Sequence, residues 1–208
     1  MVKLYEDTNI KAIANAIRAK NGTNTTYKTN EMATAILGIE TGGGGGSGSD
    51  ATANLLVSNR SGLTSYTFPE GTTKIEGYAF QSCSNLVLTE LPSTITYIGQ
   101  NAFASCTALA ISELPEGLTE VNTSAFSLCK GITTMTLPST IQYVWTSAFS
   151  MCTNLTSVIF RGTPEEIAEN AFNMCSKLTT INVPWAEGAV AGAPWGATKA
   201  TINYNYVG

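Results

Sequence analysis

The chain has 208 residues, of which 43% are hydrophobic and 12% charged, with a formal net charge of −4 and no histidine. Its length suffices for one sizeable core, while the acidic balance and lack of a basic run exclude the electrostatic footprint of nucleic-acid binding. No apolar run approaches the roughly 20 residues of a membrane helix, so we expect no membrane insertion. Without histidine, the commonest general base and metal ligand are missing.

Residues 1–41 have the apolar spacing of two short helices. Ile10, Ile13 and Ile17 recur at helical intervals on one face, and a second apolar stripe begins at Met32. Helices this short are marginal in isolation, so their stripes need another copy or a partner for burial. We therefore predict a helical hairpin that anchors or oligomerises the chain, with a homotrimer as our expectation. These residues also lack the apolar core of a secretory signal, so we expect none there.

Residues 42–50 read GGGGGSGSD, which is the composition of a flexible linker. At about 5–6 Å × √n, such a linker separates its neighbours by roughly 15–20 Å. The run lacks the lysine and following serine or threonine of a phosphate-binding loop, so we assign it no ligand.

From residue 51 onward the chain repeats with a constant period. An Ala-Phe pair precedes each cysteine, an aliphatic residue stands three positions after it, and another apolar residue stands eight after it. The cysteines are 23 residues apart: Cys83, Cys106, Cys129, Cys152 and Cys175. A fixed period of this length predicts a repeat solenoid over 51–184, with one short strand plus a turn or short helix per coil, and a C-terminal cap over 185–208.

The cysteines are expected to form a buried column of free thiols. Stacked coils place equivalent side chains about 4.8 Å apart, outside the usual 3.5–4.5 Å between the Cβ atoms of a disulfide. A structural zinc site needs close cysteine pairs, and here one cysteine falls in each coil. We therefore predict no metal and no cofactor.

The repeat resembles the BspA-like class of leucine-rich repeats, whose pattern runs I-G-x-x-A-F-x-x-C-x-x-L-x-x-I-x-L-P. The stretches IGQNAFASCTAL and CTNLTSVIF carry the resemblance, which covers about residues 54–184. Two coils depart from the pattern, reading LVLTEL and LAISEL, with Thr89 and Ser112 where an apolar residue is expected. We expect a local adjustment of register in both.

The two ends of the chain resemble a second group of proteins. The segments IANAIRAKNG and YKTNEMATAILGIETG are similar to a module of tail-fibre and baseplate-associated proteins in phages of Gram-positive and gut bacteria. The segment PWAEGAVAGAPWGATKATINYNYVG is similar to the ending of phage leucine-rich-repeat proteins. These resemblances imply a virion component assembled in the host cytoplasm, attached to other virion proteins through residues 1–41.

No constellation in the sequence indicates catalysis. Glu165, Glu166 and Glu169 form the densest acidic cluster, which we interpret as a solvated turn after Pro164 rather than an acid/base pair. Serine, threonine and tyrosine are plentiful, but no histidine or evident lysine base activates them. We predict no catalytic residue and conclude that the chain is not an enzyme.

The strand face is the better candidate site, because solenoids commonly bind ligands there. Alternation predicts that residues five and seven after each cysteine point outward, which places Leu88, Glu90, Ile111 and Glu113 in one acidic, partly apolar receptor-binding patch. A one-residue shift would turn this set inward. Trp145 breaks its column, so we include it as a candidate contact, with a capping role as the alternative.

Two further tryptophans lie in the C-terminal segment. Trp185 and Trp195 could stack on a ligand, but we favour their closing the open end of the solenoid.

The combined interpretation is a non-enzymatic phage tail-fibre or baseplate accessory. Its leucine-rich-repeat surface would bind a host-cell surface protein or glycan, with multivalency adding avidity. The alternatives are a bacterial surface adhesin, located outside the cell or on its surface, and a capsid decoration or purely structural virion protein.

Overall fold

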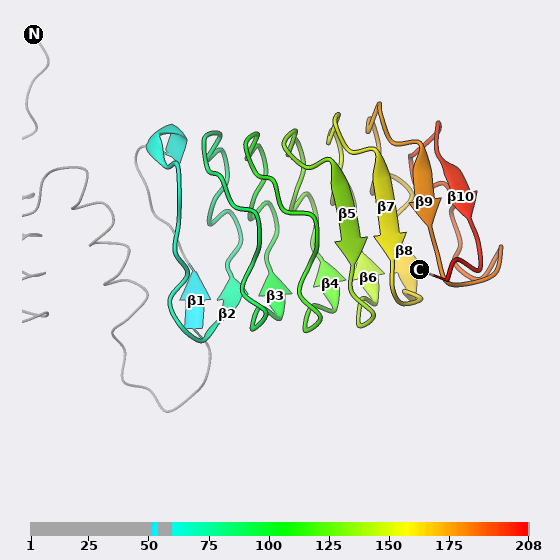
Figure 1. Ribbon diagram of the computed structural model, residues 1–208, viewed down its shortest axis with the longest axis horizontal. Helices are drawn as coiled ribbons and strands as arrows, with labels where there is room; N and C mark the ends of the chain where they lie inside the picture. Colours follow the sequence, from blue (N-terminus) through cyan, green and yellow to red (C-terminus); the bar gives the residue numbers. More distant parts are fainter. Residues whose placement is uncertain (1–50, 54–59, 208) are drawn as a thin grey trace, which may run out of the picture. The chain divides into compact units, whose positions relative to one another are not determined.

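The computed structural model describes residues 51–53 and 60–207, all of which lie in one compact unit, Gly48–Gly208. The hairpin predicted for 1–41 and the linker at 42–50 lie outside the described residues. The coils stack side by side in chain order (Figure 1). The elements are β1 (Ala51–Ala53), the 3-10 turn η1 (Arg60–Gly62), β2 (Thr72–Ile75), β3 (Tyr97–Ile98), β4 (Glu120–Val121), β5 (Thr134–Leu137), β6 (Tyr143–Val144), β7 (Ser157–Phe160), β8 (Glu166–Ile167), β9 (Thr180–Asn182) and β10 (Thr201–Asn203).

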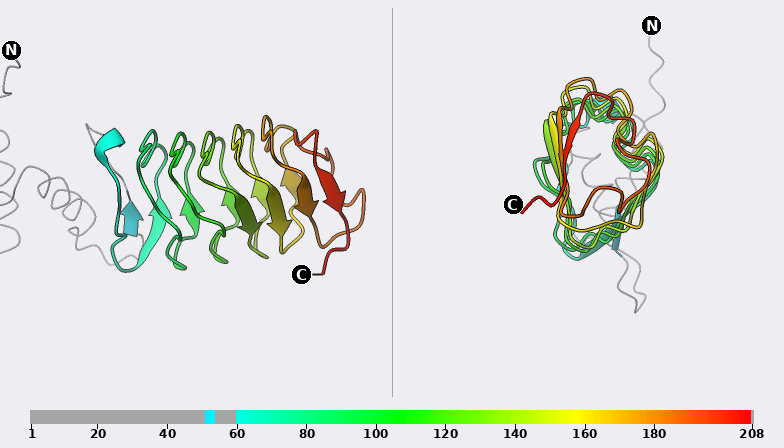
Figure 2. Two further views of the ribbon diagram at one scale, coloured as in Figure 1. Left: turned by 45° about the horizontal axis from the view of Figure 1, so that its top comes forward. Right: turned by 90° about the vertical axis from the view of Figure 1, so that its right-hand side faces the viewer.

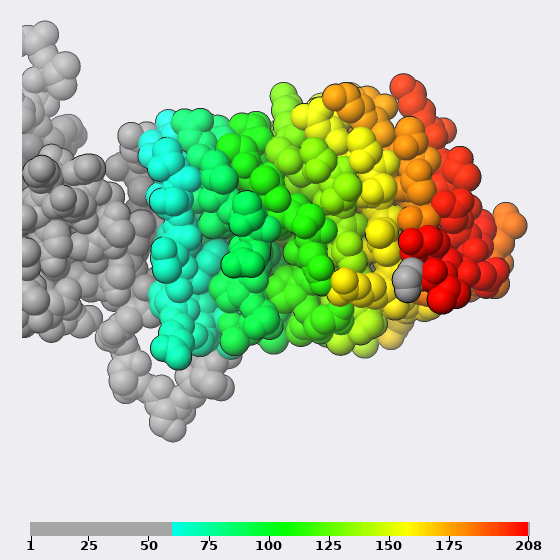
Figure 3. Space-filling view, viewed as in Figure 1, coloured from blue at the N-terminus to red at the C-terminus, as the bar shows by residue number. Residues whose placement is uncertain are grey.

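The strands form three parallel sheets along the stack. Their orders are β1-β2-β3, β4-β6-β8 and β10-β9-β7-β5. Thr134 pairs with Ser157, and Ser157 pairs with Thr180, so neighbouring strands join residues one 23-residue period apart. Viewed end on, the coils overlay around a common interior, and the space-filling view shows them as adjoining bands (Figures 2 and 3). The prediction of a repeat solenoid is therefore confirmed.

Two details of the coil differ from the prediction. The later coils carry two strands rather than one, because inward and outward side chains alternate on both sides of the coil: Met135 and Leu137 point inward on β5, and Val144 does so on β6. The second strand lies beyond the proline, where a buried aliphatic residue stands three positions before the next one, as Ile141 does before Val144. In the described part of the chain no helix other than η1 occurs.

The Ala-Phe-x-x-Cys stretch is a hydrogen-bonded turn and not the short helix proposed as one option. Phe80 and Ser82 donate their backbone N–H groups to the next coil, each at 2.7 Å, while Ala79 and Cys83 donate back within their own coil. Helical hydrogen bonding is thus interrupted at every second residue. Positive φ angles of 63° at Tyr78 and at Ser82 produce this alternation.

Two buried columns hold the coils together. The phenylalanine rings stack with centroids 5.1–5.5 Å apart and planes within 7°, at positions 80, 103, 126, 149 and 172. All five cysteines are free and buried, as predicted. From the second coil onward each thiol also donates to the backbone carbonyl of a phenylalanine in the preceding coil, at 2.9–3.1 Å. These bonds satisfy thiols that would otherwise be unpaired in the core.

Burial governs the acid–base behaviour of these thiols. It raises the pKa of Cys106 to about 12 and of Cys175 to about 11, and it raises that of Cys129 further from its usual range. The thiols are therefore protonated at neutral pH and poor nucleophiles. Among the described residues, no helix is long and apolar enough to cross a membrane.

Candidate functional site

The outward face of the later coils follows the predicted alternation. Thr134 is exposed and Thr136 half-buried on β5, Ser157 and Ile159 are half-buried on β7, and the residues between them are buried. Short polar side chains therefore dominate this surface, with Ile159 as an apolar exception.

The first two coils do not follow the prediction. Leu88 is 9% exposed and Ile111 is 1% exposed, so both belong to the core and their assignment to an outward receptor-binding patch is wrong. Inward residues stand three, five and eight positions after Cys83 and Cys106, but three, six and eight after the later cysteines. This one-residue shift reverses the side on which the fifth residue lies. Glu90 and Glu113 are exposed, as predicted.

Glu113 is not a free carboxylate. Arg161, at the end of β7, reaches past the intervening coil and forms ion pairs with Glu113 and with Glu116, the latter at 3.0 Å. Glu116 also accepts hydrogen bonds from the backbone and hydroxyl of Ser139. The predicted acidic ladder is therefore split, because Glu113 is neutralised by an arginine and Glu90 forms no ion pair with any residue that the structure describes.

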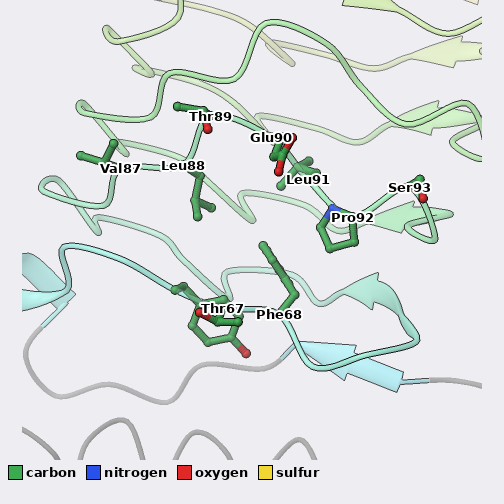
Figure 4. A pocket seen from close by; sticks show the side chains of 10 residues that line it. Thr67, Phe68, Val87, Leu88, Thr89, Glu90, Leu91, Pro92 and Ser93 are labelled. Carbon is green, nitrogen blue, oxygen red and sulfur yellow. The ribbon is translucent and has the colours of Figure 1, made fainter.

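A hollow of about 590 Å³ lies beside Glu90, between the coil that carries Tyr66 and the coil that begins at Cys83. We call it the inter-coil groove. Figure 4 shows Leu88 extending from one coil towards the other, and Phe68 extending in the opposite direction. Its lining consists of Tyr66, Thr67, Phe68, Val87, Leu88, Thr89, Glu90, Leu91, Pro92 and Ser93. Of the predicted site residues, only Leu88 and Glu90 meet here.

The groove exists because the two coils separate between two tethers. At one end the Val87 N–H donates to the Thr64 carbonyl at 2.9 Å. At the other end the Thr94 hydroxyl donates to the Thr72 carbonyl at 2.6 Å, and the Thr96 N–H donates to the Thr73 carbonyl. No strand pairing joins the coils between these points.

Trp145 lies on another side of the coil, so the structure does not bring it to Leu88 and Glu90. It stacks on Tyr143 with ring centroids 5.3 Å apart and planes 10° from parallel. Its indole N–H donates to Glu120 at 2.8 Å, and the Tyr143 hydroxyl donates to Glu165. That hydrogen bond, followed by partial burial and the charges of Glu165, Glu120 and Glu166, raises the pKa of Tyr143. Both rings remain half-exposed and lie beside three carboxylates.

The other two tryptophans are buried at the C-terminal end. Trp195 is fully enclosed, and both Trp185 and Trp195 contact Phe160, the inward residue at the end of β7. The chain then adds β10 to the edge of β9. Burial of both rings leaves them unavailable for stacking on a ligand, and it covers the apolar end of the stack.

Two features of these surfaces were not predicted from the sequence. Tyr143, the stacking partner of Trp145, was detectable because Ile141 and Val144 are inward and the residue before Val144 must face out. The walls of the inter-coil groove, which include Tyr66 and Phe68, could not be inferred from single positions.

The model of the family described as BspA type leucine rich repeat region matches residues 56–179 of this chain, in six copies. No curated protein is significantly similar to the chain.

Several solved structures resemble this one, and two of them are described here. A leucine rich cell surface protein of Faecalibacterium prausnitzii A2-165 is 28% identical, with a TM-score of 0.57 over 61% of this chain, and the chain spans 33% of its length. A leucine rich repeat protein of T. pallidum is 27% identical, with a TM-score of 0.54, covering 69% of this chain and 70% of that one.

Proposed function

We propose that this chain, which belongs to the BspA-type leucine-rich repeat family, is a non-enzymatic adhesion protein that binds a host-cell surface protein or glycan. The observation that carries the proposal is the half-exposed, stacked pair of Tyr143 and Trp145. Tyrosine and tryptophan are the residues most enriched at binding hot spots, since a large rigid ring loses little conformational entropy. Hydrogen bonds to Glu120 and Glu165 already hold these rings in place.

The proposed location is the virion, as a tail-fibre or baseplate accessory. Support comes from the resemblance of residues 1–41 and 185–208 to phage proteins. In this proposal residues 1–41 bind other virion proteins or form a homotrimer, and several solenoids bind one cell together. A bacterial surface adhesin is the second candidate, supported by the similarity to the cell surface protein of F. prausnitzii.

The absence of catalysis is part of the proposal. The abundant thiols are buried with raised pKa values, which disfavours them as nucleophiles. Across residues 60–207, no three His, Cys, Asp or Glu side chains converge as metal ligands. In the acidic cluster, the Glu165 carboxylate accepts a hydrogen bond from the Tyr143 hydroxyl and so has a structural partner.

The test compares the binding of fluorescently labelled full chain to host cells. Trp145→Ala is expected to weaken binding by at least about tenfold, the effect of a hot-spot residue. Tyr97→Ala is the matched control, because Tyr97 is an exposed aromatic on β3, at 36% exposure, without a stacking partner among the described residues. Equal binding of the two variants would refute the role of the aromatic pair. Mass spectrometry of purified phage particles and of cell envelopes then separates the two locations.

A further inference from the structure

We propose that the inter-coil groove binds an extended peptide segment of a partner protein, which adds as a strand between the coil that carries Tyr66 and the coil that begins at Cys83. The groove is remote in sequence from Tyr143 and Trp145, so this inference goes beyond the proposed receptor contact and does not depend on it. The partner segment is expected to carry a lysine or arginine, for reasons given below.

The backbone of the groove walls is unpaired. No backbone N–H or C=O group of residues 65–68 or 89–91 bonds to another described residue. In the later coils the equivalent segments are paired, as Thr134–Leu137 is with Ser157–Phe160. A row of unpaired N–H and C=O groups is a template for another strand, and strand addition is a recurrent mode of peptide recognition.

The groove is large enough to hold an extended peptide. Paired strands lie about 4.8 Å apart and leave no hollow between their backbones. Here a volume of about 590 Å³ separates the coils, which is within the usual range for ligand sites. The four residues 65–68 span roughly 13 Å when extended, so the wall matches a peptide of about four residues.

The lining of the groove combines apolar side chains with one carboxylate. Leu88 and Phe68 extend into the space between the coils and provide an apolar floor for alternate side chains of a strand (Figure 4). Val87, at the tethered end, is 53% exposed. Glu90 is the only charged residue in the lining, and it has no cationic partner in the part of the chain that the structure describes. An apolar floor with one carboxylate favours a segment that alternates apolar residues with a basic one.

The test uses full chain and the labelled peptide acetyl-TVKVT-amide at up to millimolar concentration. Fluorescence anisotropy measures binding, and hydrogen–deuterium exchange locates it. We expect fast exchange of the amides of 65–68 and 89–91 in the free chain, with slowing on peptide addition. Glu90→Lys is expected to lower the affinity about tenfold, whereas Glu169→Lys, an exposed charge outside the groove, leaves it unchanged. The same peptide with N-methylated backbone nitrogens should lose binding, because its side chains are kept and its donors removed.

Several results would overturn the proposal. Equal binding of the N-methylated peptide would show that strand pairing is not involved. Absence of protection at 65–68 and 89–91 with saturating peptide would exclude the groove as the site. Protection of these amides in free chain that rises with protein concentration would identify the occupant as a second copy of this chain. Host-cell binding by Trp145→Ala is measured separately, so failure here leaves the proposed receptor contact to its own test.

Discussion

The coils that begin at Cys83 and Cys106 differ from those that begin at Cys129, Cys152 and Cys175, although all share one period and the same interior columns. In the later coils the segment after the cysteine forms β5, β7 and β9 of a continuous sheet. In the earlier coils the only strand-type pairing that the described residues form on this side is an isolated bridge between Glu113 and Thr136. The period is therefore kept in both groups of coils, whereas strand pairing on this side occurs only where the second inward residue stands six positions after the cysteine.

The largest expected effect tests whether the fifth residue after the cysteine lies in the core of the coils that begin at Cys83 and Cys106. Ile111→Ala should reduce the free energy of unfolding by about 2–5 kcal/mol, because it removes a fully buried aliphatic side chain. Val87→Ala should change it by less than about 0.5 kcal/mol, since that side chain is largely exposed. Urea unfolding followed by circular dichroism measures both. Similar costs for the two substitutions would mean that Ile111 is not part of the core.

The second prediction concerns alkaline pH and the thiol column that both groups of coils share. Folding raises the pKa of Cys129 above its unfolded value near 8.5. The contribution of this thiol to the free energy of unfolding is therefore fully present below that pH and is lost as the pH rises towards the folded pKa. Between its unfolded and folded pKa values, each such thiol lowers the free energy of unfolding by about 1.4 kcal/mol per pH unit. Cys129→Ser, which keeps a donor for the Phe103 carbonyl but does not titrate there, should flatten the decline between pH 8.5 and 10. Parallel declines for variant and unmodified chain would contradict the burial of this thiol.

The smallest effect concerns the ion pairs that link the two groups of coils. Arg161 bonds to Glu113 and Glu116 across the intervening coil, but the side chains are 44% and 51% exposed. Arg161→Gln should therefore cost at most about 1 kcal/mol. The difference in the free energy of unfolding between the variant and the unmodified chain should shrink further in 1 M salt, where the Debye length is about 3 Å. A loss of several kcal/mol, insensitive to salt, would show that the bridge supports the junction by packing rather than charge.

Much of the fold could be predicted because the period is constant. Five cysteines and five Ala-Phe pairs in one register leave a stacked solenoid as the natural solution, and both columns are buried as expected. The inward position of Leu88 was also encoded, since Leu86 and Leu88 alternate as two inward residues of one strand do. Numbering positions from the cysteine concealed the inward position of Leu88, because the fifth residue after the cysteine faces outward in the later coils.

The candidate surfaces were harder to predict for a physical reason. The inter-coil groove exists because two adjacent segments do not pair through backbone hydrogen bonds. The identity of single residues does not predict this absence of pairing. The stacking of Trp145 on Tyr143 depends on side-chain rotamers, and the contact from Arg161 to Glu113 joins residues 48 apart. Residue type identified Trp145 and Glu90 as candidates, but only the packed coils show that they lie on separate surfaces.

The hydrogen bonds of the Ala-Phe-x-x-Cys turns have a consequence for how such genes change. The Phe80 N–H donates to the Ala102 carbonyl, Phe103 to Ala125 and Phe126 to Ala148, so each of these steps repeats the same turn hydrogen bond. A whole coil gained or lost by recombination between repeats of the same kind would therefore rejoin matching turns without altering the two ends. Relatives are expected to differ in length by entire 23-residue units, and thereby in how far their binding surfaces extend from the point of attachment.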